Sequence, residues 1–114
     1  MNDCLFCKII SGEINSIKTY ETEDVFAFRD IDPQAPQHII VVPKKHISSA
    51  NEIDGENCAI IGKIFEAIAI IAKEQGFDKT GYRVVNNCGE DGGQTVGHIH
   101  FHVLAGRNLQ WPPG

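Results

Sequence analysis

The stretch HIHFHV, residues 98–103, places three of the chain's five histidines at every second position. In an extended strand, successive side chains point to opposite faces of the sheet. The imidazoles of His98, His100 and His102 are therefore expected on one face, with apolar side chains on the other. A rise of about 3.3 Å per residue puts neighbouring imidazoles about 6–7 Å apart. That spacing allows all three to meet one ligand.

Three interpretations of this histidine face are open. It could be the polar side of an amphipathic strand that happens to be rich in histidine, although such a face would charge and repel itself below a pKa near 6.5. It could bind a metal, but one strand rarely supplies three ligands to a single tetrahedron, whereas two are feasible. The third is catalysis on an anionic group, with one imidazole attacking phosphorus and another stabilising phosphoryl oxygens.

Length and composition predict a single globular domain. The chain has 114 residues, of which 42% are hydrophobic and 22% charged, as in ordinary soluble proteins. A formal net charge of −5 argues against nucleic acid as a partner, since phosphate backbones attract Lys and Arg. A small phosphate ligand is still compatible with that charge.

The N-terminal segment, the apolar runs and the cysteines bear on the cellular compartment. No N-terminal run resembles a secretory signal and no apolar run is long enough to span a bilayer, so no membrane partner is expected. The four cysteines do not form a dense disulfide pattern, and thiols or a metal site are favoured over bridges. We expect a cytoplasmic protein.

Hydrophobic periodicity predicts an α+β fold, an antiparallel sheet with one long helix packed on a face. The long helix is expected from Asp54, as N-cap, to about Gly76, as the C′ residue, because apolar residues recur between them at steps of three and four. Further elements are expected as a short helix or turn at 4–11 and strands at 18–21, 25–29, 37–43, 81–87 and the histidine stretch.

A glycine-rich loop, CGEDGGQTVG at residues 88–97, leads into the histidine strand. Glycines let backbone N–H groups approach a ligand closely, and the side chains of Gln94 and Thr95 can donate further hydrogen bonds. A glycine-rich turn between strands is commonplace. Its position just before the imidazoles favours a phosphate site.

Cys4 and Cys7 form a CxxC pair. Such pairs bind zinc, act as redox dithiols, or are simply buried. The redox motif normally follows a strand, whereas this pair lies at the N-terminus. Zinc requires two more ligands, for which His46 and His98 are the candidates.

The segment AFRDIDPQAPQH, residues 27–38, combines a strand end with a polar turn. The carboxylate of Asp30 could accept hydrogen bonds from a ribose, and Phe28 with Ile31 could sandwich a base. His38 begins the next strand. A polar turn with solvated carboxylates is the simpler interpretation of the same residues.

These segments together resemble a known family. HIHFHVL, residues 98–104, is similar to the His-φ-His-φ-His-φ-φ signature of the histidine triad (HIT) superfamily, where φ is apolar. The residues from Phe28 to Ser48, from Gly81 to Arg107 and the terminal WPPG resemble its nucleotide-binding branch, whose members hydrolyse purine nucleoside phosphoramidates. The resemblance covers nearly the whole chain in one unbroken order.

The resemblance implies a single HIT domain over residues 1–114, with about five antiparallel strands, one long helix and a short N-terminal helix that carries the CxxC segment 4–11. It implies a homodimer whose sheets join into one, with the tail, 105–114, contacting the partner protomer. The implied activity is that of an adenosine 5′-monophosphoramidase, working through a covalent nucleotidyl-histidine.

The resemblance also implies roles for single residues. His100 would be the nucleophile, His102 would hydrogen-bond the phosphate, and His38 would support the triad that His98 begins. Phe28 and Ile31 would line the base pocket, Asp30 would hold the ribose, and Asn87 would lie beside the ribose and the phosphate. Gly93, Gln94 and Thr95 would bind the phosphate oxygens. Trp111 would reach the site from the partner protomer. Trp111 could equally do no more than pack the tail onto the dimer.

Zinc enters through the same resemblance. Many bacterial relatives carry a structural zinc on residues that match Cys4, Cys7, His46 and His98, and the closed coordination implies no catalytic cofactor. His98 is then contested, because a zinc ligand cannot easily also serve the triad with its imidazole.

Two alternatives to the phosphoramidase are kept. One is a dinucleoside polyphosphate hydrolase, which would use the same chemistry on a different substrate. The other is a zinc-stabilised nucleotide-binding or interaction module with little catalysis.

Overall fold

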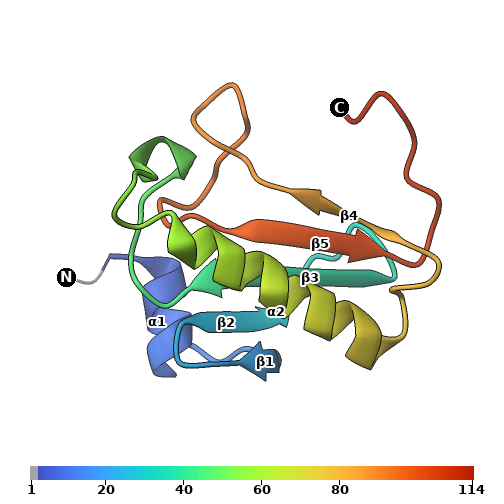
Figure 1. The fold of residues 1–114 in the computed structure, drawn as a ribbon, viewed down its shortest axis with the longest axis horizontal. Helices are drawn as coiled ribbons and strands as arrows, with labels where there is room; N and C mark the ends of the chain where they lie inside the picture. The colour runs from blue at the N-terminus through green and yellow to red at the C-terminus, as the bar shows by residue number, and fades with distance from the viewer. Residues whose placement is uncertain (1–2) are drawn as a thin grey trace.

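A five-stranded antiparallel sheet forms the body of the protein in a computed structural model that describes residues 3–114 (Figure 1). The strand order is β1-β2-β3-β5-β4, and the α+β class expected from the sequence is confirmed. The strands are β1 (Lys18–Glu21), β2 (Val25–Arg29), β3 (Gln37–Pro43), β4 (Tyr82–Val85) and β5 (Phe101–Ala105); the helices are α1 (Leu5–Ser11), the 3₁₀ turn η1 (Ala50–Glu52) and α2 (Ala59–Gln75).

The two faces of the sheet carry different side chains, because successive side chains along a strand point to opposite faces. Figure 1 shows α2 lying across one face, where its apolar side packs on the main core. That core takes alternate strand residues, among them Val25, Ala27, Ile39, Val41, Phe101 and Val103, together with Ile64, Ile68 and Ile71 of α2. The histidines of residues 98–102 project from the opposite face.

Helix α1 packs on this opposite face. The Sγ of Cys4 accepts the backbone N–H of Cys7 at 3.2 Å and so caps the helix, which ends at Gly12 with φ 88°. Its apolar residues join strand side chains in a second, smaller cluster made of Phe6, Ile9, Phe26, Phe28, Ile40 and Val42. The expected short helix at 4–11 is confirmed, with Cys4 as its cap. No helix in the described part of the chain has the length and apolar character needed to cross a bilayer.

The expected start of the long helix at Asp54 is wrong. Its carboxylate accepts the backbone N–H of Glu56 at 2.9 Å and of Asn57 at 3.0 Å, so it caps a separate turn instead. Helix α2 begins at Ala59 after Cys58, which makes no side-chain capping bond. The end at Gly76 is confirmed, since this glycine has φ 82° and closes the helix.

The last two strands are shorter than expected. The run 81–87 forms a ladder only over Tyr82–Val85, and just beyond it the side-chain amide of Asn86 donates to the carbonyl of His100 at 2.8 Å. The histidine stretch pairs only from Phe101 onward. Before it, the N–H of Ile99 donates to the carbonyl of Ile47. His98 and His100 are therefore held by a loop rather than by the sheet ladder.

Candidate functional site

His100 has one nitrogen fixed by the backbone. Its Nδ1 lies 2.8 Å from the carbonyl oxygen of His98, and a carbonyl can only accept, so Nδ1 carries the proton. The neutral ring then has its lone pair on Nε2, which makes no hydrogen bond within residues 3–114. The side chain is 3% exposed and lines a cavity. An imidazole in this state is a nucleophile or a base.

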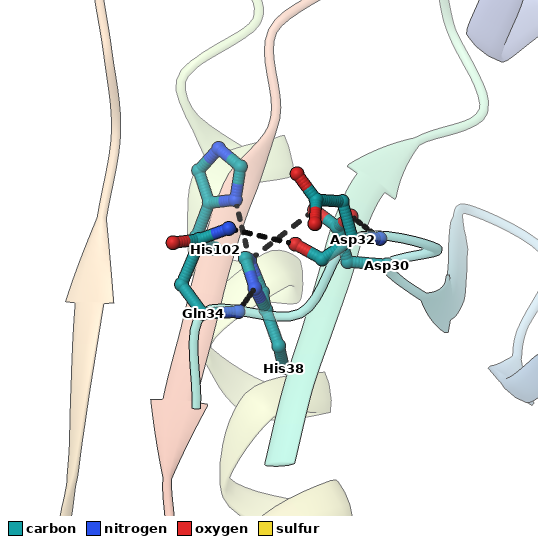
Figure 2. Close-up of polar contacts among 5 residues, drawn as sticks. All are labelled: Asp30, Asp32, Gln34, His38 and His102. Atoms are coloured by element: carbon teal, nitrogen blue, oxygen red, sulfur yellow. Dashed lines mark hydrogen bonds and ion pairs between the residues drawn. The ribbon is translucent and has the colours of Figure 1, made fainter. Parts of the chain in front are cut away.

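His102 is oriented by a chain of bonds through His38 (Figure 2). The backbone N–H of Gln34 donates to Nδ1 of His38 at 3.0 Å, so the proton of His38 is on Nε2. That Nε2 lies 2.9 Å from Nδ1 of His102 and donates to it. His102 is therefore left with a proton on Nε2. The two imidazoles of the site present opposite functions, a lone pair on His100 and a donor on His102.

The imidazoles of His38 and His102 are both neutral at pH 7. Burial, reinforced by the nearby His100 and His38, lowers the pKa of His102 to about 4. Burial also lowers the pKa of His38, against an opposing effect from the carboxylates of Asp30 and Asp32. Nε2 of His38 lies 3.4 Å from Asp30. The neutral state agrees with the hydrogen-bond directions and keeps each tautomer defined.

His100 and His102 line a cavity of about 280 Å³. Its other walls are mainly apolar and come from α1, the segment after it, β2 and β3. The lining residues include Leu5, Phe6, Ile9, Ile14, Phe28, Ile31 and Ile40 on the apolar side, and Asp30, Thr95, His100 and His102 on the polar side. An apolar pocket with a few convergent polar groups is typical of a small-molecule site.

The remaining residues expected at the site lie elsewhere or face away. The Gln94 amide donates to the carbonyls of Ser48 at 2.8 Å and Val96 at 2.9 Å and so braces its own loop. Asn87 donates to Gly92 of the same loop. Gln94, Asn87 and Gly93 do not line the 280 Å³ cavity. Trp111 is 81% exposed on the C-terminal tail, which runs away from the sheet (Figure 1).

Sequence reasoning missed the contribution of α1 to this cavity. Phe6 contacts Phe28 with ring centroids 5.6 Å apart and His100 with centroids 5.0 Å apart. Ile9 and Ile14 extend the same wall. The apolar residues of CLFCKII were the available signal, but they are also what any packed helix requires. Gln34, whose backbone sets the tautomer of His38, left no signal in the sequence.

A second cluster gathers the four metal-ligand candidates. The ligand atoms of Cys4, Cys7, His46 and His98 all lie within 4.8 Å of one another. Nδ1 of His98 is 3.2 Å from Nδ1 of His46, 3.3 Å from Sγ of Cys4 and 3.6 Å from Sγ of Cys7. A tetrahedron with Zn–N near 2.05 Å and Zn–S near 2.3 Å has edges of about 3.3 Å between nitrogens and about 3.6 Å from nitrogen to sulfur. The donor set and its spacing fit zinc.

A hydrogen bond from Nε2 of His98 orients its imidazole toward this cluster. Nε2 lies 2.9 Å from the carbonyl of Pro43 and donates to it, so Nδ1 presents its lone pair to the two sulfurs. Metal-binding histidines are commonly fixed in this way. Burial lowers the pKa of His98 and keeps it neutral. Burial, with the sulfur of Cys4 beside it, raises the pKa of Cys7 to about 11, so a bound cation is what would make this sulfur a thiolate.

His98 takes part in both clusters, through its imidazole in one and through its main-chain carbonyl in the other. Its imidazole belongs to the metal cluster, and its carbonyl holds His100. A larger cavity of about 490 Å³ opens beside Gly97 and the metal cluster. Neither His100 nor His102 lines it, whereas both line the smaller cavity.

Known proteins share both the sequence and the fold of this chain. The HIT domain description matches residues 11–109. A 14 kDa zinc-binding protein of Zea mays is 45% identical over 96% of this chain and 87% of its own length. A HIT family hydrolase from Legionella pneumophila is 44% identical, with a TM-score of 0.96 over 98% of this chain and all of that one. A histidine triad nucleotide-binding protein from Candida albicans is 33% identical, with a TM-score of 0.83 over 96% and 83% of the two chains.

Proposed function

Because this chain belongs to the HIT domain family, we propose that it is a nucleotide-binding hydrolase that cleaves the P–N bond of purine nucleoside 5′-phosphoramidates. The observation that carries the proposal is the bond from Nδ1 of His100 to the carbonyl of His98. It leaves Nε2 unprotonated beside an apolar cavity with a polar end. The Legionella pneumophila relative, named a hydrolase, supports the reaction class.

The reaction proceeds in two displacements at phosphorus. Nε2 of His100 attacks the α-phosphorus, the P–N bond breaks, and the departing amine takes a proton from a nearby imidazole or water. The Nε2–H of His102 donates to a phosphoryl oxygen as negative charge builds there. Water then attacks the nucleotidyl-imidazole, releases the nucleoside monophosphate and restores His100. Neither displacement requires a metal.

The nucleotide lies along the 280 Å³ cavity. The base packs between apolar side chains that include Phe28 and Ile31, and Asp30 accepts hydrogen bonds from the ribose hydroxyls. Thr95 contacts the phosphate beside the histidines, with the backbone of Gly93 and the amides of Gln94 and Asn87 nearby in the loop. The Candida albicans relative, named nucleotide-binding, supports this class of ligand.

The protein acts as a homodimer in which the two sheets join at their edges. In that assembly Trp111 of one protomer reaches the site of the other and influences which leaving groups fit. The tail position of Trp111, 81% exposed in the single chain, supports this arrangement. Sedimentation of the parent and of Trp111→Ala, with turnover of amines of different size, tests both parts.

Zinc is the ion for the cluster of Cys4, Cys7, His46 and His98. Support comes from the spacing of the ligand atoms and from the Zea mays relative, which is named a zinc-binding protein. Four protein ligands leave no position for a reactive water, so the role of zinc is structural.

The decisive experiment compares the parent with His100→Asn and Cys58→Ser. We expect His100→Asn to lose turnover of adenosine 5′-phosphoramidate at least about 1,000-fold, as for loss of a nucleophile, while it still binds AMP. Cys58→Ser, an exposed thiol outside both clusters, should match the parent. Parental turnover by His100→Asn would refute the assigned nucleophile.

The two alternatives predict different outcomes. A dinucleoside polyphosphate hydrolase would turn over diadenosine tetraphosphate faster than the phosphoramidate. A binding module would bind AMP and zinc but turn over neither substrate. Parental turnover after zinc is stripped would exclude a catalytic metal.

A further inference from the structure

Helix α1 stands between the metal cluster and the nucleotide cavity. Cys4 and Cys7 bracket Phe6 in the sequence. The ring of Phe6 contacts His100 at a centroid distance of 5.0 Å and His98 at 6.1 Å. Leu5, Phe6 and Ile9 line the cavity. One short helix therefore provides two of the metal ligands and one wall of the nucleotide site.

The polar contacts between α1 with its cap and the rest of the fold run through the sulfurs of Cys4 and Cys7. Within residues 3–114, the polar contacts that tie Leu5–Ser11 and its cap to the chain beyond residue 14 are those of Cys4 and Cys7 with His46 and His98. The rest is apolar packing in the smaller cluster. A seven-residue helix is not stable alone. A metal ion on the four ligands would cross-link this wall to the loop that carries His98.

The second connection runs through His98 itself. Its imidazole lies in the metal cluster, while its carbonyl accepts the Nδ1 proton of His100 at 2.8 Å. Any shift of the His98 backbone changes the acceptor that sets the tautomer of the nucleophile. The metal cluster thus contacts the nucleotide site at its wall and at its nucleophile.

We propose that occupancy of the metal cluster and nucleotide binding are energetically coupled, with Cys4, Cys7 and His46 acting as positioning residues for the nucleotide site. The proposal rests on the function proposed above. A nucleotide that binds metal-free protein must also order the α1 wall, whereas in metal-loaded protein the wall is already ordered. Coupling is reciprocal, so nucleotide must raise zinc affinity by the same factor that zinc raises nucleotide affinity.

Two titrations measure this factor. Zinc affinity is determined by chelator competition with and without saturating AMP, and AMP affinity by calorimetry in zinc-loaded and metal-free protein. We expect both affinities to rise by the same factor, roughly tenfold, within the usual range for coupled sites. Cys58→Ser, the matched control outside the cluster, should show the parental factor. Equal affinities in the presence and absence of the other ligand would overturn the proposal.

A second readout keeps the protein folded throughout, in case chelation unfolds it. Co²⁺ replaces zinc, and AMP is titrated while the visible absorption of the metal site is recorded. We expect a saturable change in the spectrum, which is smaller in Phe6→Leu because the contact from the wall is lost. AMP that binds by calorimetry but leaves the Co²⁺ spectrum unchanged overturns the coupling alone. AMP that does not bind at all overturns the proposed function and the coupling with it.

Discussion

The Nδ1 of His100 donates to the main-chain carbonyl of His98 across 2.8 Å, while the imidazole of His98 turns away into a cluster of cysteine and histidine ligands. His98 thereby serves two sites with different atoms. The apparent conflict between a zinc ligand and a triad member disappears, because the triad needs only the carbonyl. The side chain of His98 can then be changed without removing the acceptor for His100.

Replacing that side chain should separate the two roles. His98→Ala removes one metal ligand and keeps the backbone carbonyl. We expect zinc affinity to fall more than about 100-fold, beyond the 10–100-fold typical of losing an outer partner, while turnover is reduced but measurable. Metal content and phosphoramidate kinetics check both. If His98→Ala were as inactive as His100→Asn, the imidazole of His98 would have a catalytic role that its geometry denies.

Arg107 is expected to position His102 from a distance. Its Nε and Nη2 donate to the carbonyl of Gln34 at 3.2 and 3.0 Å, and the N–H of Gln34 fixes His38, which orients His102. Arg107→Ala should lower kcat about tenfold, roughly 1.4 kcal/mol in the barrier, with little change in KM.

Two further variants serve as controls for the Arg107 experiment. Arg107→Lys retains a charge but not the paired N–H groups, so it should restore only part of kcat. Lys63→Ala, at a surface ion pair of 4.0 Å with Asp24, should leave kcat unchanged. An unaltered kcat in Arg107→Ala would show that Gln34 keeps its position without the two hydrogen bonds from Arg107.

Stability should decline in mild acid. The pKa of His102 is lowered to about 4 and that of His38 is lowered too, each mainly by burial. Between pH 6.5 and 4 the unfolded chain binds a proton at His102 that the folded protein does not, and His38 contributes in the same direction below pH 6.5, so the free energy of unfolding decreases as pH falls. The slope for each histidine cannot exceed about 1.4 kcal/mol per pH unit, and the partial solvent exposure of His102 reduces it.

Urea midpoints at pH 7 and pH 5 test this pH dependence. His102→Gln lacks one titrating ring but keeps the metal cluster, so its midpoint should change less between the two pH values than that of the parent. Equal changes in parent and variant would assign the acid sensitivity to other groups.

Chelation should destabilise the fold as well as empty the metal cluster. A ligand that binds only the folded state adds stability that grows with its affinity, and α1 is otherwise held to the sheet by apolar packing. We expect the melting temperature to fall by at least about 10 °C, which is a few kcal/mol for a domain of this size. Cys7→Ser should reproduce the fall without chelator, and Cys58→Ser should not.

Much of the architecture followed from local pattern. The β-branched run QHIIVVP, ended by Pro43, predicted β3, the steps of three and four predicted the body of α2, and Gly76 predicted its end. Each of these signals is carried by residues that are neighbours along the chain. The start of α2 was wrong because Asp54 can cap any turn that offers free N–H groups, and Asp54 caps the turn before the helix.

The candidate site was predictable in its chemistry but not in its connections. Residue type and spacing pointed to His100, His102 and the four metal candidates. Which atom of each residue meets which partner depends on contacts between segments far apart in sequence, such as Gln34 with Arg107 or Cys4 with His98. No local pattern encodes those contacts.

Alternation of an extended backbone predicted His98, His100 and His102 on one side, and they lie on that side although only Phe101 onward pairs in the sheet. Their division of labour came from packing. Folding placed the carbonyl of His98 against His100, His38 against His102, and two cysteines against the imidazole of His98. A tautomer is set by its hydrogen-bond partner, and only the tertiary structure supplies that partner.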